Sequence, residues 1–377
     1  MLARNAWEKR KLGEVATITM GQSPDSKNYT LNPQDHILVQ GNADIKNGWV
    51  EPRVWTTQIT KIAKKGSVLL SVRAPVGEVS KTAFDVVLGR GVASVGQTDF
   101  LYQYLITLKI NGFWLRYSTG STFDSINSAD IKDAIIFLPE KNEQSRIAKT
   151  LNCIDNLIAA TQDKIDALEQ AKRALLQRLF DQSWRFKGYS DPWEKRKLRE
   201  VSDVRDGTHA SPKYYSQGYP LVTSKNLTSA GLDFSNISLI SELDYKNINK
   251  RSRVDKGDIL FGMIGTIGTP VMVHESNFAI KNVALIKERE AVLNSFLVQL
   301  LKSPAFINYI RNENVGGTQK FLSLNTIRNF RFSFPTSKEQ AMVSRFLEKI
   351  DSLIAATQSR LSSLELLKKA LLQDLFI

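Results

Sequence analysis

The sequence contains few of the residues that build disulfides and soft-metal sites. Its 377 residues include one cysteine, Cys153, and three scattered histidines, His36, His209 and His274. A single cysteine excludes an intramolecular disulfide and suits a reducing compartment. The histidines and the cysteine do not occur at a spacing that zinc sites use. We therefore expect a cytoplasmic protein that binds no metal of its own.

Long hydrophobic runs are also missing. No stretch approaches the roughly 18 apolar residues that cross a bilayer. The first residues, MLARNAWEKRKLGEV, lack the apolar core of a secretory signal peptide. We expect no contact with a membrane.

Catalytic signatures are absent from the sequence as well. It has no Walker A motif, no Gly-x-Ser-x-Gly elbow and no His-Glu-x-x-His. It also lacks the Asn/Asp-Pro-Pro-aromatic tetrapeptide of amino-methyltransferases and an acidic nuclease cluster.

Gly262, Gly265 and Gly268 have the spacing of a phosphate-binding loop, but a strand-like run follows them instead of a helix, which favours tight turns. Asp203 and Asp206 stand near a turn and are interpreted as capping or solvent-exposed carboxylates. The chain is expected to bind and not to catalyse.

Positive charge is what the sequence has in excess. Hydrophobic residues make up 42% and charged residues 24%, a globular composition with length for two or more domains. Lysine and arginine outnumber aspartate and glutamate by 51 to 38. Such a surplus favours a polyanionic partner, most commonly nucleic acid, although membrane surfaces also attract basic proteins.

The chain contains an internal repeat of about 190 residues. Residues 7–15 read WEKRKLGEV and residues 193–201 read WEKRKLREV. Residues 154–162, IDNLIAATQ, return as IDSLIAATQ at 350–358. Because the matches keep their order, the sequence indicates a tandem duplication.

The two copies agree unevenly along their length. Residues 143–180 and 339–376 are almost alike in pattern, whereas 16–136 and 202–332 agree only at scattered glycines and apolar positions. This difference favours a shared scaffold that carries two different recognition domains. Plain drift after duplication is the alternative.

The two segments that agree most closely between the copies have the sequence pattern of long helices. Apolar residues alternate at spacings of three and four from Leu151 to Leu179 and from Leu347 to Leu375, interrupted by Lys172 and Lys368. This is a heptad seam, and about 38 helical residues would span on the order of 57 Å. The positions expected to pair the helices are Ile154, Ile158, Ile165, Leu168, Leu175, Ile350, Ile354, Leu361, Leu364 and Leu371.

The predicted fold class is α+β. Two tandem-repeated globular α/β domains, residues 1–140 and 184–335, would be separated by helical spacers at 141–183 and 336–377. The spacers would pack as an antiparallel coiled coil and give the chain an approximate two-fold symmetry. Two separate bundles, or a stripe that recruits another protein's helices, remain as alternatives. The charge surplus lies in the globular ranges, with 16 basic against 13 acidic residues in 1–140 and 22 against 14 in 184–335.

Polar loops at matched places in the two copies are candidates for reading DNA. Base edges are read by amide, guanidinium and hydroxyl groups on loops. Ordinary solvated turns would give the same composition, but the candidates occur in pairs. In the first copy they are Gln40, Asn42, Arg90, Ser121 and Thr122; in the second they are Thr223, Lys225, Asn226, Lys281, Thr318, Gln319 and Lys320.

With these features in place, the chain resembles the DNA specificity subunit (S subunit) of type I restriction–modification systems over nearly its whole length. The resemblance rests on the repeated opening at Trp7 and Trp193 and on the runs GSVLLSVRAPVGEV and GDILFGMIGTIG. The Gly-Gly-Thr-Gln turn at Gly316 and the P-x₃-E-Q sequences at Pro139 and Pro335 complete it.

The resemblance implies two target recognition domains that each read one half of a bipartite sequence in double-stranded DNA. It implies helical spacers that fix the gap between the half-sites and dock two methyltransferase (modification) subunits, to which restriction subunits can add. S-adenosylmethionine, ATP and Mg²⁺ would belong to those partners and no cofactor to this chain. Two rival functions remain: a basic coiled-coil scaffold without sequence preference, and a stand-alone enzyme.

Overall fold

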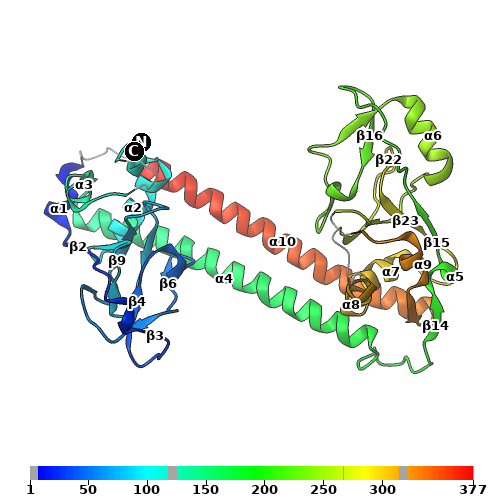
Figure 1. The fold of residues 1–377 in the computed structure, drawn as a ribbon, viewed down its shortest axis with the longest axis horizontal. Helices are drawn as coiled ribbons and strands as arrows, with labels where there is room; N and C mark the ends of the chain where they lie inside the picture. Colours follow the sequence, from blue (N-terminus) through cyan, green and yellow to red (C-terminus); the bar gives the residue numbers. More distant parts are fainter. Residues whose placement is uncertain (1–6, 118–124, 266, 314–320, 377) are drawn as a thin grey trace. The chain divides into compact units, whose positions relative to one another are not determined.

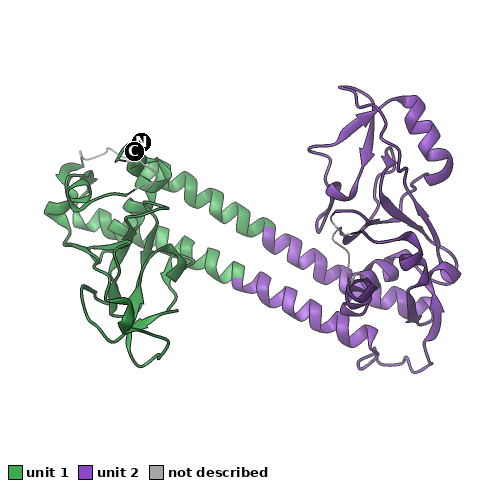
Figure 2. Cartoon of the chain, viewed as in Figure 1, with its two compact units in different colours: residues 1–162, 359–377 green, residues 163–358 purple. Residues whose placement is uncertain are grey.

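The computed structural model describes residues 7–117, 125–265, 267–313 and 321–376. The predicted DNA-binding residues Ser121, Thr122, Thr318, Gln319 and Lys320 lie outside the described residues. The chain forms two compact units (Figure 2): residues 1–162 with 359–377, and residues 163–358. Each unit therefore takes a part of both long helices, α4 (Lys141–Phe180) and α10 (Ser337–Leu375), and the division cuts across the expected spacer ranges.

Unit 1 contains three sheets with short helices beside them (Figure 1). The strand orders are β2-β12-β9-β10-β6-β5, β3-β7-β4-β11-β8 and β1-β13. The strands are β1 Glu8–Lys11, β2 Ile18–Met20, β3 Tyr29–Thr30, β4 His36–Val39, β5 Ile45–Lys46, β6 Trp49–Val50, β7 Trp55–Thr56, β8 Ile62–Ala63, β9 Val68–Ser71, β10 Val79–Lys81, β11 Val86–Leu88, β12 Val92–Val95 and β13 Ile135–Leu138. The helices are α1 Leu12–Val15, α2 Asp99–Ile110 and α3 Ser128–Lys132, with 3₁₀ turns η1 Ser26–Asn28, η2 Asn42–Asp44 and η3 Phe113–Tyr117.

Unit 2 follows a similar order of elements in its described residues, but it has no counterpart of η1, β3 and β8, it adds helix α6, and it has helix α8 where unit 1 has the turn η3. Its strand orders are β15-β23-β20-β21, β19-β16-β22, β14-β24 and β17-β18. The strands are β14 Glu194–Lys197, β15 Asp203–Asp206, β16 Tyr219–Val222, β17 Leu227–Thr228, β18 Gly231–Leu232, β19 Ser238–Ile240, β20 Ile259–Gly262, β21 Gly268–Met272, β22 Ala279–Ile280, β23 Val283–Lys287 and β24 Arg331–Phe334. The helices are α5 Leu198–Val201, α6 Glu242–Ser252, α7 Asn294–Leu301, α8 Pro304–Glu313 and α9 Leu324–Asn329, with the 3₁₀ turn η4 Ser224–Asn226.

The repeated sequence motifs lie where the two ends of each globular part meet the long helices. The WEKRK openings become strands β1 and β14, which pair antiparallel with β13 and β24 at the other end of the globular part. In the P-x₃-E-Q sequences, the Gln144 and Gln340 amides donate to the carbonyls of Pro139 and Pro335, both at 2.8 Å. The glutamine thus bonds back to the residue two positions before the helix and fixes the direction in which the helix leaves the sheet. The prediction of turns at Gly265 and Gly268 is confirmed, because both have positive φ and lie in the β20–β21 hairpin.

An aromatic cluster at each globular part includes a residue from the other copy's helix. In unit 1, Trp7 and Phe100 pack against Phe376, just after α10, with ring centroids 6.0 and 5.5 Å away. In unit 2, Phe296 lies 5.9 Å from Trp193 and 5.3 Å from Phe180, the last residue of α4. Each repeat therefore supplies the end of its helix to the core of the unit that the other repeat begins.

Each of the two lysines that interrupt the heptad seam forms an ion pair with an aspartate of the other long helix. Lys368 contacts Asp155 at 2.5 Å in unit 1, and Lys172 contacts Asp351 in unit 2. Because Asp351 and Lys368 follow Asp155 and Lys172 by the repeat offset of 196 residues, the two pairs are the same contact with the copies exchanged. In unit 1, Trp7 contacts both Glu143 and Phe376, so residue numbers rise from 143 to 155 along α4 while they fall from 376 to 368 on the other segment, and the two segments are antiparallel, as expected.

A buried glutamine joins each ion pair to the globular part of its unit. Gln103 on α2 donates to Asp155 at 2.7 Å, and Gln299 on α7 donates to Asp351 at 3.2 Å. Both glutamines are almost fully buried. Around these contacts, the predicted seam positions are buried at Ile154 and Ile165 and half-buried at the remaining ones.

Reversing one charge of this network is expected to destabilise unit 1. Asp155→Lys would place two ammonium groups at pairing distance, where Lys368 is only 18% exposed, and should lower the free energy of unfolding by about 1–3 kcal/mol. The double change Asp155→Lys with Lys368→Asp should restore most of the lost free energy of unfolding. Urea denaturation measures the free energy of unfolding of the single and of the double variant. Glu242→Lys, which breaks the exposed pair with Lys246, is the matched control and should change the midpoint little; an equal loss there would contradict the role of the seam.

Candidate nucleic-acid interface

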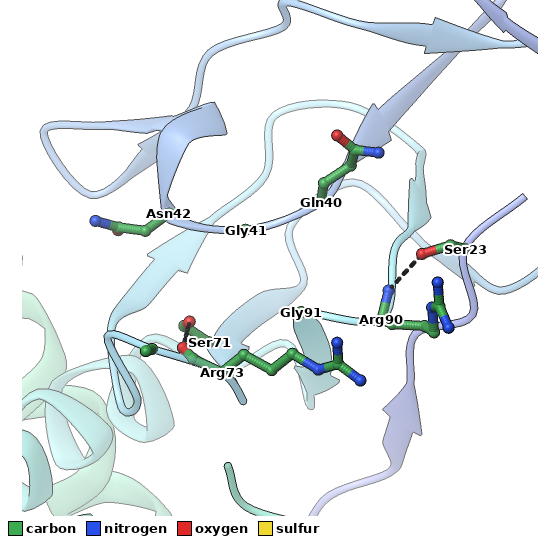
Figure 3. A pocket seen from close by; sticks show the side chains of 9 residues that line it. Ser23, Gln40, Gly41, Asn42, Ser71, Arg73, Arg90 and Gly91 are labelled. Atoms are coloured by element: carbon green, nitrogen blue, oxygen red, sulfur yellow. Dashed lines mark hydrogen bonds between the residues drawn. The ribbon is translucent and has the colours of Figure 1, made fainter. Parts of the chain in front are cut away.

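Three of the predicted residues in unit 1 meet in one polar pocket. Gln40 follows β4 and Arg90 follows β11, and these strands pair in parallel, so that their carboxyl ends lie at the same edge of the sheet. The pocket has a volume of about 220 Å³ (Figure 3). The residues that line it are Ser23, Gln40, Gly41, Asn42, Ser71, Arg73, Ala74, Arg90 and Gly91.

Glycines hold the three loops of this pocket against one another. A Cβ on Gly91 would lie 2.2 Å from the carbonyl oxygen of Gln40, and one on Gly21 would lie 2.0 Å from that of Gly89. Any larger residue at these places would push the loops apart. Two backbone segments come equally close in unit 2, where a Cβ on Gly207 would lie 2.4 Å from the carbonyl oxygen of Ile280. The matched glycines of the two copies thus position the loops that carry the candidate residues.

Arg73 is a pocket residue that the sequence reasoning missed. It follows β9, whose end pairs with the start of β12, and this brings it beside Arg90. In Figure 3 its side chain extends along the pocket toward Arg90. Ser71 and Ser23 support this geometry, because their hydroxyls bond the Arg73 carbonyl and the Arg90 amide at 2.9 and 3.1 Å. The available signal in the sequence was the RAPVG run at residues 73–77, in which the arginine directly follows a strongly apolar strand-like run.

Unit 2 brings its equivalent loops together in the same way. Thr223 follows β16 and Lys281 follows β22, and these two strands are also a parallel pair. The Lys281 ammonium donates to the Ser211 hydroxyl at 2.8 Å, which ties it to the polar turn after β15. Lys225, on the η4 turn, is exposed. A second pocket, with a volume of about 430 Å³, is lined by the polar turn after β15 and by α6; Ser211, Asn247 and Arg251 contribute to its lining.

Asn226 does not fit its predicted role in DNA binding. It is 8% exposed, and its side-chain carbonyl accepts from the backbone amide and the hydroxyl of Thr223, both at 2.9 Å. Its amide donates to the carbonyl of Asp233 at 3.0 Å. The side chain is therefore buried and holds the loop's shape, with its oxygen and one of its two amide hydrogens bonded inside the protein.

The interpretation of Asp206 as a capping or solvated carboxylate is also wrong. Asp206 is 7% exposed and binds the Arg251 guanidinium and the ring of His209. Asp203, by contrast, stays at the surface, and the hydrogen bond from Arg205 lowers its pKa. The buried carboxylate was missed because its partners are three and 45 residues away, on a turn and on α6.

His209 sits between two oxygen acceptors. Its ring nitrogens lie 2.9 Å from a carboxylate oxygen of Asp206 and 2.9 Å from the amide oxygen of Asn282. Only the doubly protonated ring donates to both, so Asp206 first and Asn282 second raise the pKa of His209, while burial and the charge of Arg251 oppose the change. The protonated ring adds a positive charge next to Lys281.

Raising the pH should remove a stabilising contribution of His209 to unit 2. Because its folded pKa is raised above the ordinary 6.5, the contribution is complete below that pH and is lost as the pH rises through the folded pKa. Urea midpoints of the wild type and of His209→Gln should therefore differ most below pH 6.5 and converge as the pH rises above the folded pKa of His209. The exposed His274→Gln is the control. A difference that stays constant with pH would contradict the assignment.

The described residues form no group of three or more histidine, cysteine, aspartate or glutamate side chains that could hold a metal ion. Within the described part of the chain, no helix is both long and apolar enough to cross a membrane.

Comparison with known proteins gives concordant matches. A family model described as Type I restriction modification DNA specificity domain matches residues 5–170 and 190–366. A protein of Methanocaldococcus jannaschii named as a type I restriction enzyme specificity subunit is 33% identical over 178 residues; the match covers 45% of this chain and 41% of that protein. The type I restriction enzyme MjaIX specificity subunit of the same organism is 23% identical, and the match covers 98% of this chain and 92% of the relative.

Solved structures match the fold. The S subunit of a type I restriction–modification system from M. genitalium matches with a TM-score of 0.68 at 17% identity, over 100% of this chain and 98% of that one. A chain from a study of complex assembly and conformational transition of the type I R-M system matches with a TM-score of 0.58 at 18% identity, over 99% and 98%.

Proposed function

Since this chain belongs to the family of type I restriction–modification DNA specificity domains, we propose that it is the subunit that selects the DNA sequence on which a modification and restriction complex acts. Each globular part reads one half of a two-part site in double-stranded DNA. The two long helices set the gap between the halves.

One observation carries this proposal. In each unit a parallel pair of strands, β4–β11 or β16–β22, ends in two polar loops that meet at one edge and carry a basic residue, Arg90 or Lys281. The scaffold of this edge is repeated, whereas the side chains on it differ. A chain that must read two different half-sites needs this combination, because positioning can be shared while base contacts cannot.

The remaining parts of the proposal concern partners and chemistry. Two modification subunits dock on the chain, and restriction subunits can join them. S-adenosylmethionine, ATP and Mg²⁺ act in those partners, and this chain binds DNA in the cytoplasm without catalysing a step. The relatives named as specificity subunits support this division of labour.

A methylation map of the host genome with and without the gene tests the function. We expect a methylated two-part motif with a fixed gap to disappear when the gene is deleted. If the map is unchanged although a modification subunit co-purifies with the chain, the chain is a scaffold. Binding to purified DNA that falls with salt and shows no sequence preference would lead to the same conclusion.

A further inference from the structure

The unit 1 pocket contains two guanidinium groups, and neither has an acidic partner among the residues that the structure describes. Within the described residues, neither Arg73 nor Arg90 forms an ion pair, and both side chains are exposed. Other arginines near the recognition loops are held by carboxylates, for instance Arg53 by Asp44 and Arg251 by Asp206. Two like charges that converge on one pocket without compensation indicate an acceptor-rich ligand.

The other groups in the pocket decide which acceptor fits. The hydroxyl groups of Ser23 and Ser71 already bond the backbone, so the side chains left for a ligand are the two guanidiniums and the amides of Gln40 and Asn42. A backbone phosphate offers only acceptors and would leave the amide oxygens without a role. A base-pair edge offers acceptors and donors together, and guanine O6 and N7 are the pair that an arginine fork matches.

Unit 2 lacks this arrangement at the equivalent place. The position of Arg73, which bridges to Ser125, is taken by Ile264, which bridges to Phe321. Both Ile264 and Phe321 are partly exposed. The position of Arg90 is taken by Lys281, whose ammonium is bound to Ser211.

We propose that Arg73 and Arg90 read a guanine, so that the half-site of unit 1 contains a G·C pair recognised in this pocket, whereas unit 2 does not read guanine at the equivalent position. The inference rests on the proposed function and adds to it the base that one unit selects.

The conservative change Arg73→Lys tests this proposal. It keeps the positive charge but replaces the planar two-pronged donor by a single ammonium. A phosphate contact would then weaken equally for every sequence, whereas a bidentate guanine contact would lose part of its preference for guanine over the other bases. We expect the full chain, assembled with its modification subunits, to lose discrimination at one G·C position of one half-site by about tenfold to a hundredfold. Arg90→Lys should reduce the selectivity at the same G·C position. Selection from a randomised DNA library measures every position at once.

Controls separate the outcomes. Arg146→Lys, an exposed residue on α4 outside the pocket, should leave all positions unchanged. If Arg73→Lys keeps full selectivity while Arg73→Ala weakens binding to every sequence and lowers its salt dependence, the pocket holds a phosphate and the proposal is overturned. Relaxation at an A·T position also overturns it. If the wild-type complex selects no two-part motif, the proposed function itself fails. Thermal unfolding of each variant excludes misfolding.

Discussion

Exchanging residues 184–335 for the corresponding segment of another family member is expected to replace one half of the recognised DNA sequence completely. The other half and the gap should stay as they are. The reason is that the recognition loops of unit 2, around Thr223 and Lys281, lie wholly inside the exchanged segment, whereas the pocket of unit 1 lies wholly outside it. The methylation motif of the chimaera gives the result directly.

The exchange must preserve the contacts that join this segment to the helices. Phe296 packs on Phe180, and Arg185 forms a bidentate ion pair with Glu339 at 2.7 and 3.0 Å. A donor that retains these residues is therefore required. The reciprocal exchange of residues 1–140 serves as the matched control and should replace the other half alone. Alteration of both halves by either exchange would refute independent reading.

Inserting one heptad into each long helix is expected to lengthen the gap and leave both half-sites unaltered. Seven residues after Gln162 and seven after Gln358 would keep the seam in phase, because both helices continue through these points. They add about 10 Å of helix, which corresponds to about three base pairs of DNA. The methylation map should show the original half-sites at the new spacing and no methylation at the old one.

A single insertion is the control for this experiment. A heptad in α4 alone would shift the seam by two turns and separate Lys172 from Asp351, so we expect loss of methylation instead of a longer gap. If the double insertion keeps the original gap, the helices do not set it.

The sequence predicted the parts of this structure that depend on periodicity and repetition. The long helices and the pairing of loops between copies follow from local patterns or from the offset between copies. The lysines at 172 and 368 were visible only as interruptions of the seam. Their partners Asp155 and Asp351 could not be identified, because each pair joins residues about 180 to 210 positions apart in the chain.

The candidate site was predicted in outline and not in detail. The convergence of Gln40 and Arg90 follows from matched loops, but the addition of Arg73 requires knowing that β9 and β12 are neighbours. Asn226 was misassigned because an amide that completes a turn has the same composition as one that reads a base. The hydrogen bonds of a polar loop residue must therefore be known before a role in DNA binding can be assigned to it.

The shared aromatic clusters have a consequence for the order of events during synthesis. Unit 2 is continuous in the chain and has all its residues once position 358 has left the ribosome, whereas unit 1 is interrupted and needs residues 359–377. Trp7 and Phe100 find Phe376 only after all of unit 2 has been synthesised. Unit 1 is thus completed after unit 2, and a stop codon at position 359 would remove part of unit 1 although its globular part is translated first.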